Sequence, residues 1–136
     1  MPHRCSMRLI SFAMLLAATS VAHADDAAMA AKELDNGGRT YLRYCALCHG
    51  IDGRGGGPLA ESLEKQPPDL TKIAERNGGS YPDDKVKAII DKGGVKSHGM
   101  MAMLAWGKVF KEEIGEDAKA GIIASLNAYI RSLQGR

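Results

Sequence analysis

Cysteine is scarce in this sequence, which has three in 136 residues: Cys5, Cys45 and Cys48. Cys5 lies in an N-terminal segment that we expect to be removed, so the folded chain keeps one pair. One pair cannot form the extended disulfide framework of a small secreted domain. A structural zinc site is also disfavoured, because it usually takes four Cys or His ligands. Outside the N-terminal segment the chain offers only His49 and His98 besides that pair.

The chain also lacks an apolar run long enough to cross a membrane. Its most apolar stretch, residues 9–18, has about ten residues, whereas a membrane-spanning helix needs roughly 20. Arg4 and Arg8 precede the stretch, and the small residues Ala22 and Ala24 follow it. This order predicts a secretory signal peptide that is cleaved after Ala24, with an uncleaved membrane anchor as the alternative. The expected location is therefore the periplasm.

Charge of one sign is not in excess. The whole chain has 18 Lys and Arg against 16 Asp and Glu, a formal charge of +2. Loss of the signal peptide, residues 1–24, would remove Arg4 and Arg8 and leave a formal charge of zero. A neutral chain lacks the basic surface of nucleic-acid-binding proteins, so we expect no nucleic-acid partner. Residues 25–136 suffice for one domain, and we expect it to have no stable membrane insertion.

The two remaining cysteines stand in a specific motif. Cys45-Ala46-Leu47-Cys48-His49 has the C-x-x-C-H spacing with which haem c is attached. The two thiols match the two vinyl groups of the haem, and His49 follows where its imidazole reaches the iron. A thioredoxin-like C-x-x-C would need a βαβ context, and no strand pattern of useful length occurs. The motif predicts one haem c, covalently attached through Cys45 and Cys48, with His49 on the iron.

Methionine, by contrast, is abundant. The chain has seven, three of which are Met100, Met101 and Met103. Methionine usually fills irregular gaps in a core. Beside a haem, one of these thioethers can instead take the sixth position of the iron, which raises the reduction potential of an electron carrier. The three thioethers are chemically equivalent, and His98 is a further candidate that would give a bis-histidine haem of lower potential.

Repeats, low-complexity tracts and strand patterns are all missing, and the spacing of apolar residues favours an all-α fold with long loops. We expect a first helix from Asp35-Asn36 into the haem motif. Gly37 in that helix either lets another helix cross closely or marks a frayed start. Residues 50–58, rich in glycine, predict a loop. Further helices are expected over residues 69–76, 82–93 and 117–133, the last with an apolar stripe of Ile122, Ile123, Leu126, Ile130 and Leu133.

Together these segments resemble the class I cytochromes c of bacteria over nearly all of residues 25–136. The resemblance rests on Tyr41-x-x-x-Cys45-Ala46-Leu47-Cys48-His49-Gly50, Gly57-Pro58, Pro68-Asp69-Leu70-Thr71, Arg76-Asn77-Gly78-Gly79, and the segment from His98-Gly99 to Trp106-Gly107. It implies the class I cytochrome c fold, with four to five helices around one covalently bound haem. It also implies that the N- and C-terminal helices cross, with Gly37 at the crossing.

The resemblance further implies roles for single residues. In that family the carbonyl at the position of Pro58 accepts the Nδ1 proton of the ligand histidine, which fixes the ring. The axial methionine stands three residues before the tryptophan, which favours Met103 ahead of Trp106. Many relatives have a proline where this chain has Leu104, so the loop here lacks the stiffness of proline.

Two residues lie in segments that resemble the loops around the haem. We expect Arg76 and Trp106 to donate hydrogen bonds to the haem propionates. The alternatives are a solvated arginine and a core tryptophan whose N–H bonds to the backbone.

The function that the resemblance implies is that of a periplasmic monohaem cytochrome with His/Met axial ligands. It would pass single electrons between redox protein partners, a dehydrogenase or an oxidase. No residue set for acid–base or covalent catalysis accompanies the motif, so we expect an electron carrier and not an enzyme, and a monomer. Two alternatives stay open: a ligand-binding or peroxide-reducing haem protein, and a cytochrome subunit bound tightly to a dehydrogenase.

Overall fold

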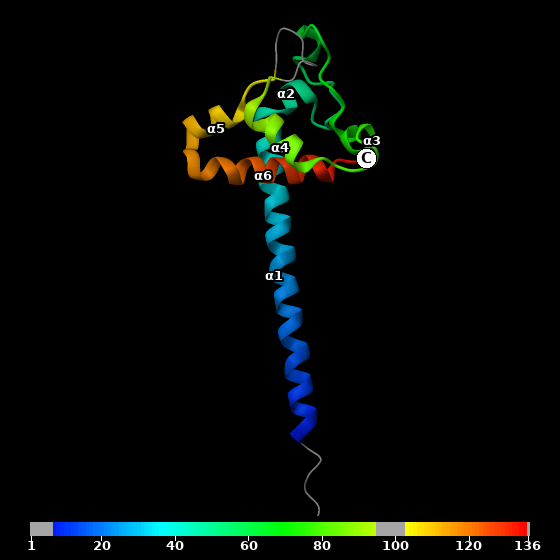
Figure 1. The fold of residues 1–136 in the computed structure, drawn as a ribbon, viewed down its shortest axis with the longest axis vertical. Helices are drawn as coiled ribbons and strands as arrows, with labels where there is room; N and C mark the ends of the chain where they lie inside the picture. The colour runs from blue at the N-terminus through cyan, green and yellow to red at the C-terminus, as the bar shows by residue number, and fades with distance from the viewer. Residues whose placement is uncertain (1–6, 95–102, 136) are drawn as a thin grey trace, which may run out of the picture. The chain divides into compact units, whose positions relative to one another are not determined.

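The computed structural model describes residues 7–94 and 103–135, with side chains from Ala24 onward. Within these ranges the ordered elements are all helical and there is no strand, which confirms the expected all-α fold (Figure 1). The chain divides into two units, Met1–Lys32 and Glu33–Arg136. The elements in chain order are α1 (Met7–Tyr44), α2 (Ala46–His49), η1 (Ala60–Ser62), η2 (Leu70–Lys72), α3 (Ile73–Arg76), α4 (Asp83–Lys92), α5 (Trp106–Ile114) and α6 (Glu116–Ser132).

Helix α1 begins much earlier than the sequence suggested. We expected its start at Asp35-Asn36, but the helix is continuous from Met7 to Tyr44, so that expectation was wrong. Residues 24–34 contain no Pro or Gly and are rich in Ala, the strongest helix former. The Asp35 carboxylate forms an ion pair with Arg39 one turn later. This pair lies within the helix, so Asp35 does not cap a helix start. Among the described residues, no helix is both long and apolar enough to cross a bilayer.

The crossing of the N- and C-terminal helices is confirmed at Gly37. A Cβ atom on Gly37 would lie 2.0 Å from the Ser125 carbonyl oxygen and 2.9 Å from Cβ of Tyr129, so only glycine lets the two backbones approach this closely. One turn later on α1, the ring of Tyr41 packs against Tyr129 with 5.2 Å between ring centroids. Tyr41 and Leu126 are almost completely buried at this crossing. Gly37 therefore serves helix packing and is not a frayed start.

Helices α4, α5 and α6 pack on one another and complete the core of the Glu33–Arg136 unit. Their inward faces supply most of the buried apolar side chains. A glycine again permits the closest approach, since a Cβ on Gly107 of α5 would lie 2.8 Å from the backbone oxygen of Asp91 in α4. Gly93 ends α4 with a φ of 57°, in the left-handed region that glycine tolerates. The buried apolar side chains of these three helices are Val86, Ile90, Phe110, Ile123, Leu126 and Ile130.

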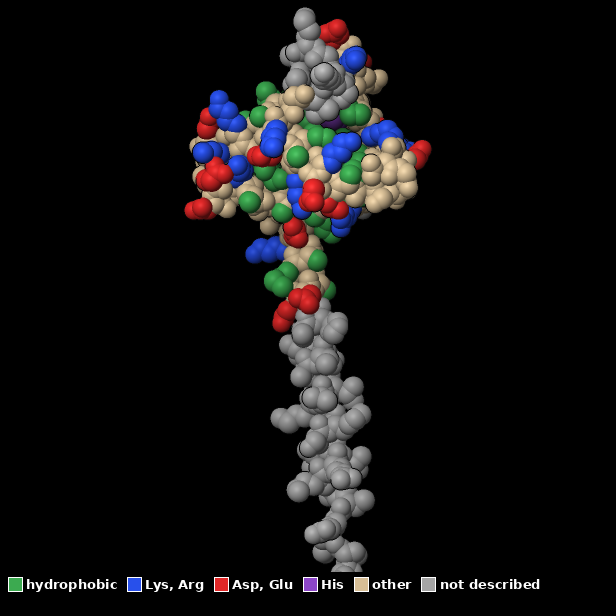
Figure 2. All heavy atoms as spheres, viewed as in Figure 1, with side chains coloured by type: hydrophobic (Ala, Val, Ile, Leu, Met, Phe, Trp, Pro, Cys, Tyr) green, Lys and Arg blue, Asp and Glu red, His purple; other side chains and the backbone are tan. Residues whose placement is uncertain are grey.

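The C-terminal residues hold the short helices η2 and α3 in place. The Gln134 side chain donates to the Leu70 carbonyl at 2.8 Å and accepts the N–H of Ala74 at 2.9 Å. Acidic and basic side chains mix over the face of this unit seen in Figure 2. Several of them pair, as Lys119 does with Glu116 at 2.7 Å. This pattern agrees with the balanced charge of the sequence.

Candidate functional site

The C-x-x-C-H segment lies at the junction of α1 and α2. The Cys45 carbonyl accepts hydrogen bonds from the N–H groups of Cys48 at 3.1 Å and His49 at 2.9 Å. Cys45 and His49 are 9% and 7% exposed, whereas Cys48 is half-buried. Burial, with a smaller contribution from Cys48, raises the pKa of the Cys45 thiol to about 12. At neutral pH Cys45 is therefore a protonated thiol, unlike the low-pKa thiolate of a nucleophilic cysteine.

Tyr41 and Gly50 fix the two ends of this segment. Gly50 follows α2 with a φ of 79°, which favours glycine. The buried Tyr41 hydroxyl donates to the Gly50 carbonyl at 2.7 Å. The hydrogen bond links the last turns of α1 to the residue after His49, so the backbone that carries His49 is anchored within the core.

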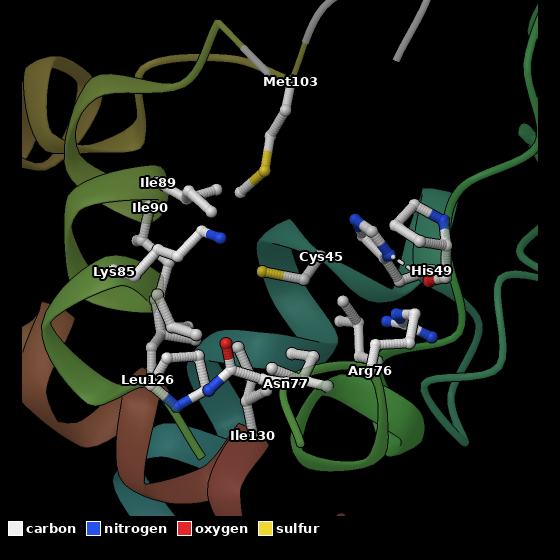
Figure 3. A pocket seen from close by; sticks show the side chains of 15 residues that line it. Cys45, His49, Arg76, Asn77, Lys85, Ile89, Ile90, Met103, Leu126 and Ile130 are labelled. Carbon is white, nitrogen blue, oxygen red and sulfur yellow. Dashed lines mark hydrogen bonds between the residues drawn. The ribbon is translucent and has the colours of Figure 1, made fainter. Parts of the chain in front are cut away.

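A cavity of about 490 Å³ opens beside this segment (Figure 3). Its size falls within the range of small-molecule and cofactor sites. Most of its wall is apolar and comes from α4, α6, η2 and α3, and Cys45 and His49 contribute from the haem motif. The lining residues are Cys45, His49, Pro68, Leu70, Ile73, Arg76, Asn77, Pro82, Lys85, Val86, Ile89, Ile90, Met103, Leu126 and Ile130.

Two side chains of the kinds that bind haem iron enter this cavity from different segments. The His49 ring comes from α2, and the thioether of Met103 comes from the segment just before α5 (Figure 3). The Met103 backbone is held in place, because its carbonyl accepts the N–H of Gly94 at 3.1 Å. The structure thus brings together Cys45, His49 and Met103, which the sequence had assigned to one haem. An apolar cavity with an imidazole, a thioether and an attachment thiol fits a covalently held haem in both size and donor set.

The sequence pointed to Pro58 as the neighbour of the His49 ring, and the structure adds Pro68. The carbonyl oxygen of Pro68 lies 3.4 Å from His49 Nδ1. Pro58 is not among the described residues that line the cavity. The Leu59 N–H donates to the Leu47 carbonyl at 2.9 Å, which holds this part of the loop along α2. An Nδ1–H directed at Pro68 leaves Nε2 as the nitrogen with a lone pair for a metal.

Arg76 and Trp106 differ in their relation to the cavity. Arg76 lines it, and its Nη2 donates to the Asp69 carbonyl at 2.6 Å. Trp106 is not among the described lining residues. Its ring packs instead on Phe110 and Tyr44, with centroids 6.1 and 5.3 Å apart. The structure therefore places the Trp106 ring in an aromatic cluster against the core, and the hydrogen bond of its N–H to a propionate stays a prediction.

Sequence reasoning missed Pro68 as a neighbour of His49, and it missed Lys85 as a lining residue. Lys85 precedes Val86 and stands one helical turn before Ile89, both of which line the cavity. Its position on the cavity face of α4 was therefore detectable from helical spacing. For Pro68 no local signal exists, because its approach to His49 depends on the path of the loop between them.

The other candidate ligands lie outside the described residues. These are Met100, Met101 and His98, so the choice of Met103 over them stays a prediction. In the part of the chain that the structure describes, no three His, Cys, Asp or Glu side chains form a group that could hold a metal ion.

A known protein family matches most of the chain. The family described as cytochrome c oxidase, cbb3-type, subunit III matches residues 32–124, which contain the C-x-x-C-H motif, the cavity lining up to Met103, and most of α6. Comparisons with curated proteins and with solved structures gave no significant match.

Proposed function

Because the chain belongs to the c-type cytochrome family of cbb3-type oxidase subunit III, we propose that it is a periplasmic monohaem cytochrome with His49 and Met103 as axial ligands. It transfers single electrons between protein partners. One observation carries the proposal: His49 and Met103, 54 positions apart in the sequence, line the same apolar cavity as the attachment residue Cys45.

The bound haem c supplies reversible one-electron chemistry at its iron. Cys45 and Cys48 hold it covalently, which prevents its loss from an exported protein. The apolar wall of α4 and α6 excludes water, and the Pro68 carbonyl, 3.4 Å from His49 Nδ1, orients the imidazole. Keeping the same two side chains as ligands in both oxidation states limits the rearrangement that accompanies electron transfer.

The family description points to an oxidase as the electron acceptor. We infer an acceptor of this class, while the donor is a protein of unspecified kind. We propose a monomeric carrier that meets its partners in short-lived encounters; the face seen in Figure 2, where acidic and basic side chains mix, is compatible with such encounters. A peroxide-reducing or ligand-binding protein would need a vacant sixth position, and Met103 in the cavity argues against it.

The test is export of the full chain in a bacterium that matures c-type cytochromes. We expect the purified protein to begin at Asp25 and to carry the mass of one haem on the peptide that contains Cys45 and Cys48. Its ferric spectrum should show the far-red band of a methionine–iron bond. The reduced protein should pass electrons to a membrane oxidase without consuming peroxide. A high-spin ferric spectrum with rapid peroxide turnover would favour the ligand-binding alternative instead.

A further inference from the structure

The charged residues that line the cavity are of one sign. Arg76 and Lys85 are cations, and none of the described lining residues is Asp or Glu. A haem carries two carboxylates, and anions held against an apolar wall need compensating cations nearby. Arg76 was expected in this role, but its Nη2 already donates to the Asp69 carbonyl at 2.6 Å. Lys85 offers the second charge.

Lys85 reaches the cavity from α4, whereas Arg76 reaches it from α3. Figure 3 shows the Lys85 amino group directed into the cavity that Cys45 and Met103 also line. Lys85 is the third residue of α4 and stands one turn before Ile89, so both residues lie on the cavity face of the helix. The residue is exposed by more than a third, which agrees with a position at the rim.

The Lys85 ammonium has no anionic partner within the described part of the chain. The neighbouring Lys87 pairs with Asp84 at 3.7 Å, and Arg131 pairs with Asp83. Both carboxylates at the start of α4 are therefore directed toward other cations. The cavity thus presents an uncompensated positive charge where a dianionic ligand would complete it.

We propose that Lys85 is the charge partner of a haem carboxylate and that its ammonium raises the midpoint potential of the haem. The inference rests on the proposed function, since it requires a bound haem. A cation near the haem disfavours ferric iron, which carries one more positive charge than ferrous iron. Because Lys85 lies at the solvent-exposed rim, salt should weaken the effect.

The test compares Lys85→Gln, Lys85→Met and Lys85→Arg with wild type as purified holoproteins. We expect both neutral variants to retain covalent haem and to have a lower midpoint potential at low ionic strength. Lys85→Arg should restore most of the wild-type value. Added salt should reduce the difference between Lys85→Gln and wild type. Lys87→Gln is the matched control, because it removes a lysine from the same helix at a position that does not line the cavity.

Three results separate the possible failures. Equal potentials in Lys85→Gln and Lys87→Gln would overturn the inference while leaving the proposed function intact. Loss of an axial ligand signal from the Lys85→Gln ferric spectrum would also overturn it, because Lys85 would then bind the iron. A wild-type protein without covalent haem would instead contradict the proposed function itself.

Discussion

Among single residues, Met103 carries most of the argument for an electron carrier. Its side chain lines the cavity that also receives His49. Replacing Met103 with Ala removes the thioether, so we expect the ferric protein to lose the far-red methionine–iron band. The midpoint potential should fall markedly, because a neutral sulfur ligand stabilises ferrous iron. Ferric absorption spectra and redox titration of the purified holoprotein measure both effects.

Met29 provides the matched control for this substitution. It lies on α1 with 63% of its surface exposed, and it does not line the cavity. Met29→Ala should leave both the spectrum and the potential unchanged. Met100→Ala and Met101→Ala complete the series. If Met103→Ala keeps the band and the potential, one of these neighbours holds the sixth position.

Asp69 should make the stability of the fold dependent on pH. Its Oδ1 accepts the Thr71 hydroxyl at 2.6 Å and the Thr71 N–H at 2.8 Å, and the hydroxyl bond is the main cause that lowers the pKa of Asp69. A lowered pKa in the folded state means that the ionised form is favoured by folding. Its stabilising contribution is present above the unfolded-state pKa of about 3.9 and is lost as the pH falls through the lower folded-state value.

We therefore expect Asp69→Asn to lower the free energy of unfolding at neutral pH, and the difference from wild type to shrink in acid. Urea unfolding of the holoprotein at several pH values measures this. Asp84→Asn is the control, because the Asp84 side chain is fully exposed and pairs only at 3.7 Å. If the free energy of unfolding of Asp69→Asn differs from that of wild type by the same amount down to acid pH, ionisation of Asp69 does not contribute to the pH dependence of stability.

The site residues differ in how far sequence can identify them. Cys45, Cys48 and His49 were proposed from one contiguous motif, whose spacing is typical of covalent haem attachment. The approach of Pro68 to His49 could not be foreseen, since it depends on the path of the loop from Gly50 to Pro68. For Trp106 the sequence offered two roles: an indole N–H suits a propionate, but its ring also completes the cluster with Tyr44 and Phe110.

At the level of helices, the crossing of α1 and α6 has so little space at Gly37 that a single added carbon atom would disturb the packing. A Cβ on Gly37 would meet the Ser125 backbone oxygen at 2.0 Å, and no rotamer change can move a backbone atom away. Alanine would gain about 1 kcal/mol of helix propensity but would force the helices apart, at about 1–3 kcal/mol for overpacking. We expect Gly37→Ala to destabilise the holoprotein in denaturant unfolding followed by circular dichroism.

Gly121 is the matched control for Gly37. It lies in α6, and a Cβ there would meet no atom within 4 Å. Gly121→Ala should therefore stabilise the protein by about 1 kcal/mol through helix propensity alone. If the two substitutions change stability in the same direction, the close approach at Gly37 is not what limits that position.

Helix boundaries were predictable where local chemistry defines them. The helix expected over residues 82–93 matches α4, Asp83–Lys92, because Pro82 and Gly93 mark its ends. The last helix was also placed within a residue of α6, Glu116–Ser132. The start of α1 was wrong because a capping residue inside a strongly helical stretch does not interrupt it. Helix α5 was not foreseen, although Trp106, Val109 and Phe110 have helical spacing.

In the molecule as a whole, the cavity adjoins the hydrophobic core and shares residues with it. About 490 Å³ lies between α4, α6 and the haem motif, lined by residues such as Leu126 and Ile130 that are otherwise almost fully buried. A domain of this size has little apolar surface to spare. Removing atoms from a core costs stability in proportion to the space left empty. The ligand that fills the cavity therefore contributes to folding as well as to function.

This leads to a prediction about folding without the haem. In Cys45→Ala/Cys48→Ala the covalent attachment is lost, and we expect a colourless, largely unfolded protein after export. Circular dichroism should show lost helix, and the fluorescence of Trp106, the single tryptophan, should shift to that of a solvated indole. Cys5→Ala is the control, because Cys5 lies in the segment expected to be cleaved, so its mature protein should equal wild type in mass, colour and stability. A colourless double variant that unfolds as cooperatively as wild type would show that the fold does not depend on haem. It would contradict the inference that the ligand in the cavity stabilises the fold.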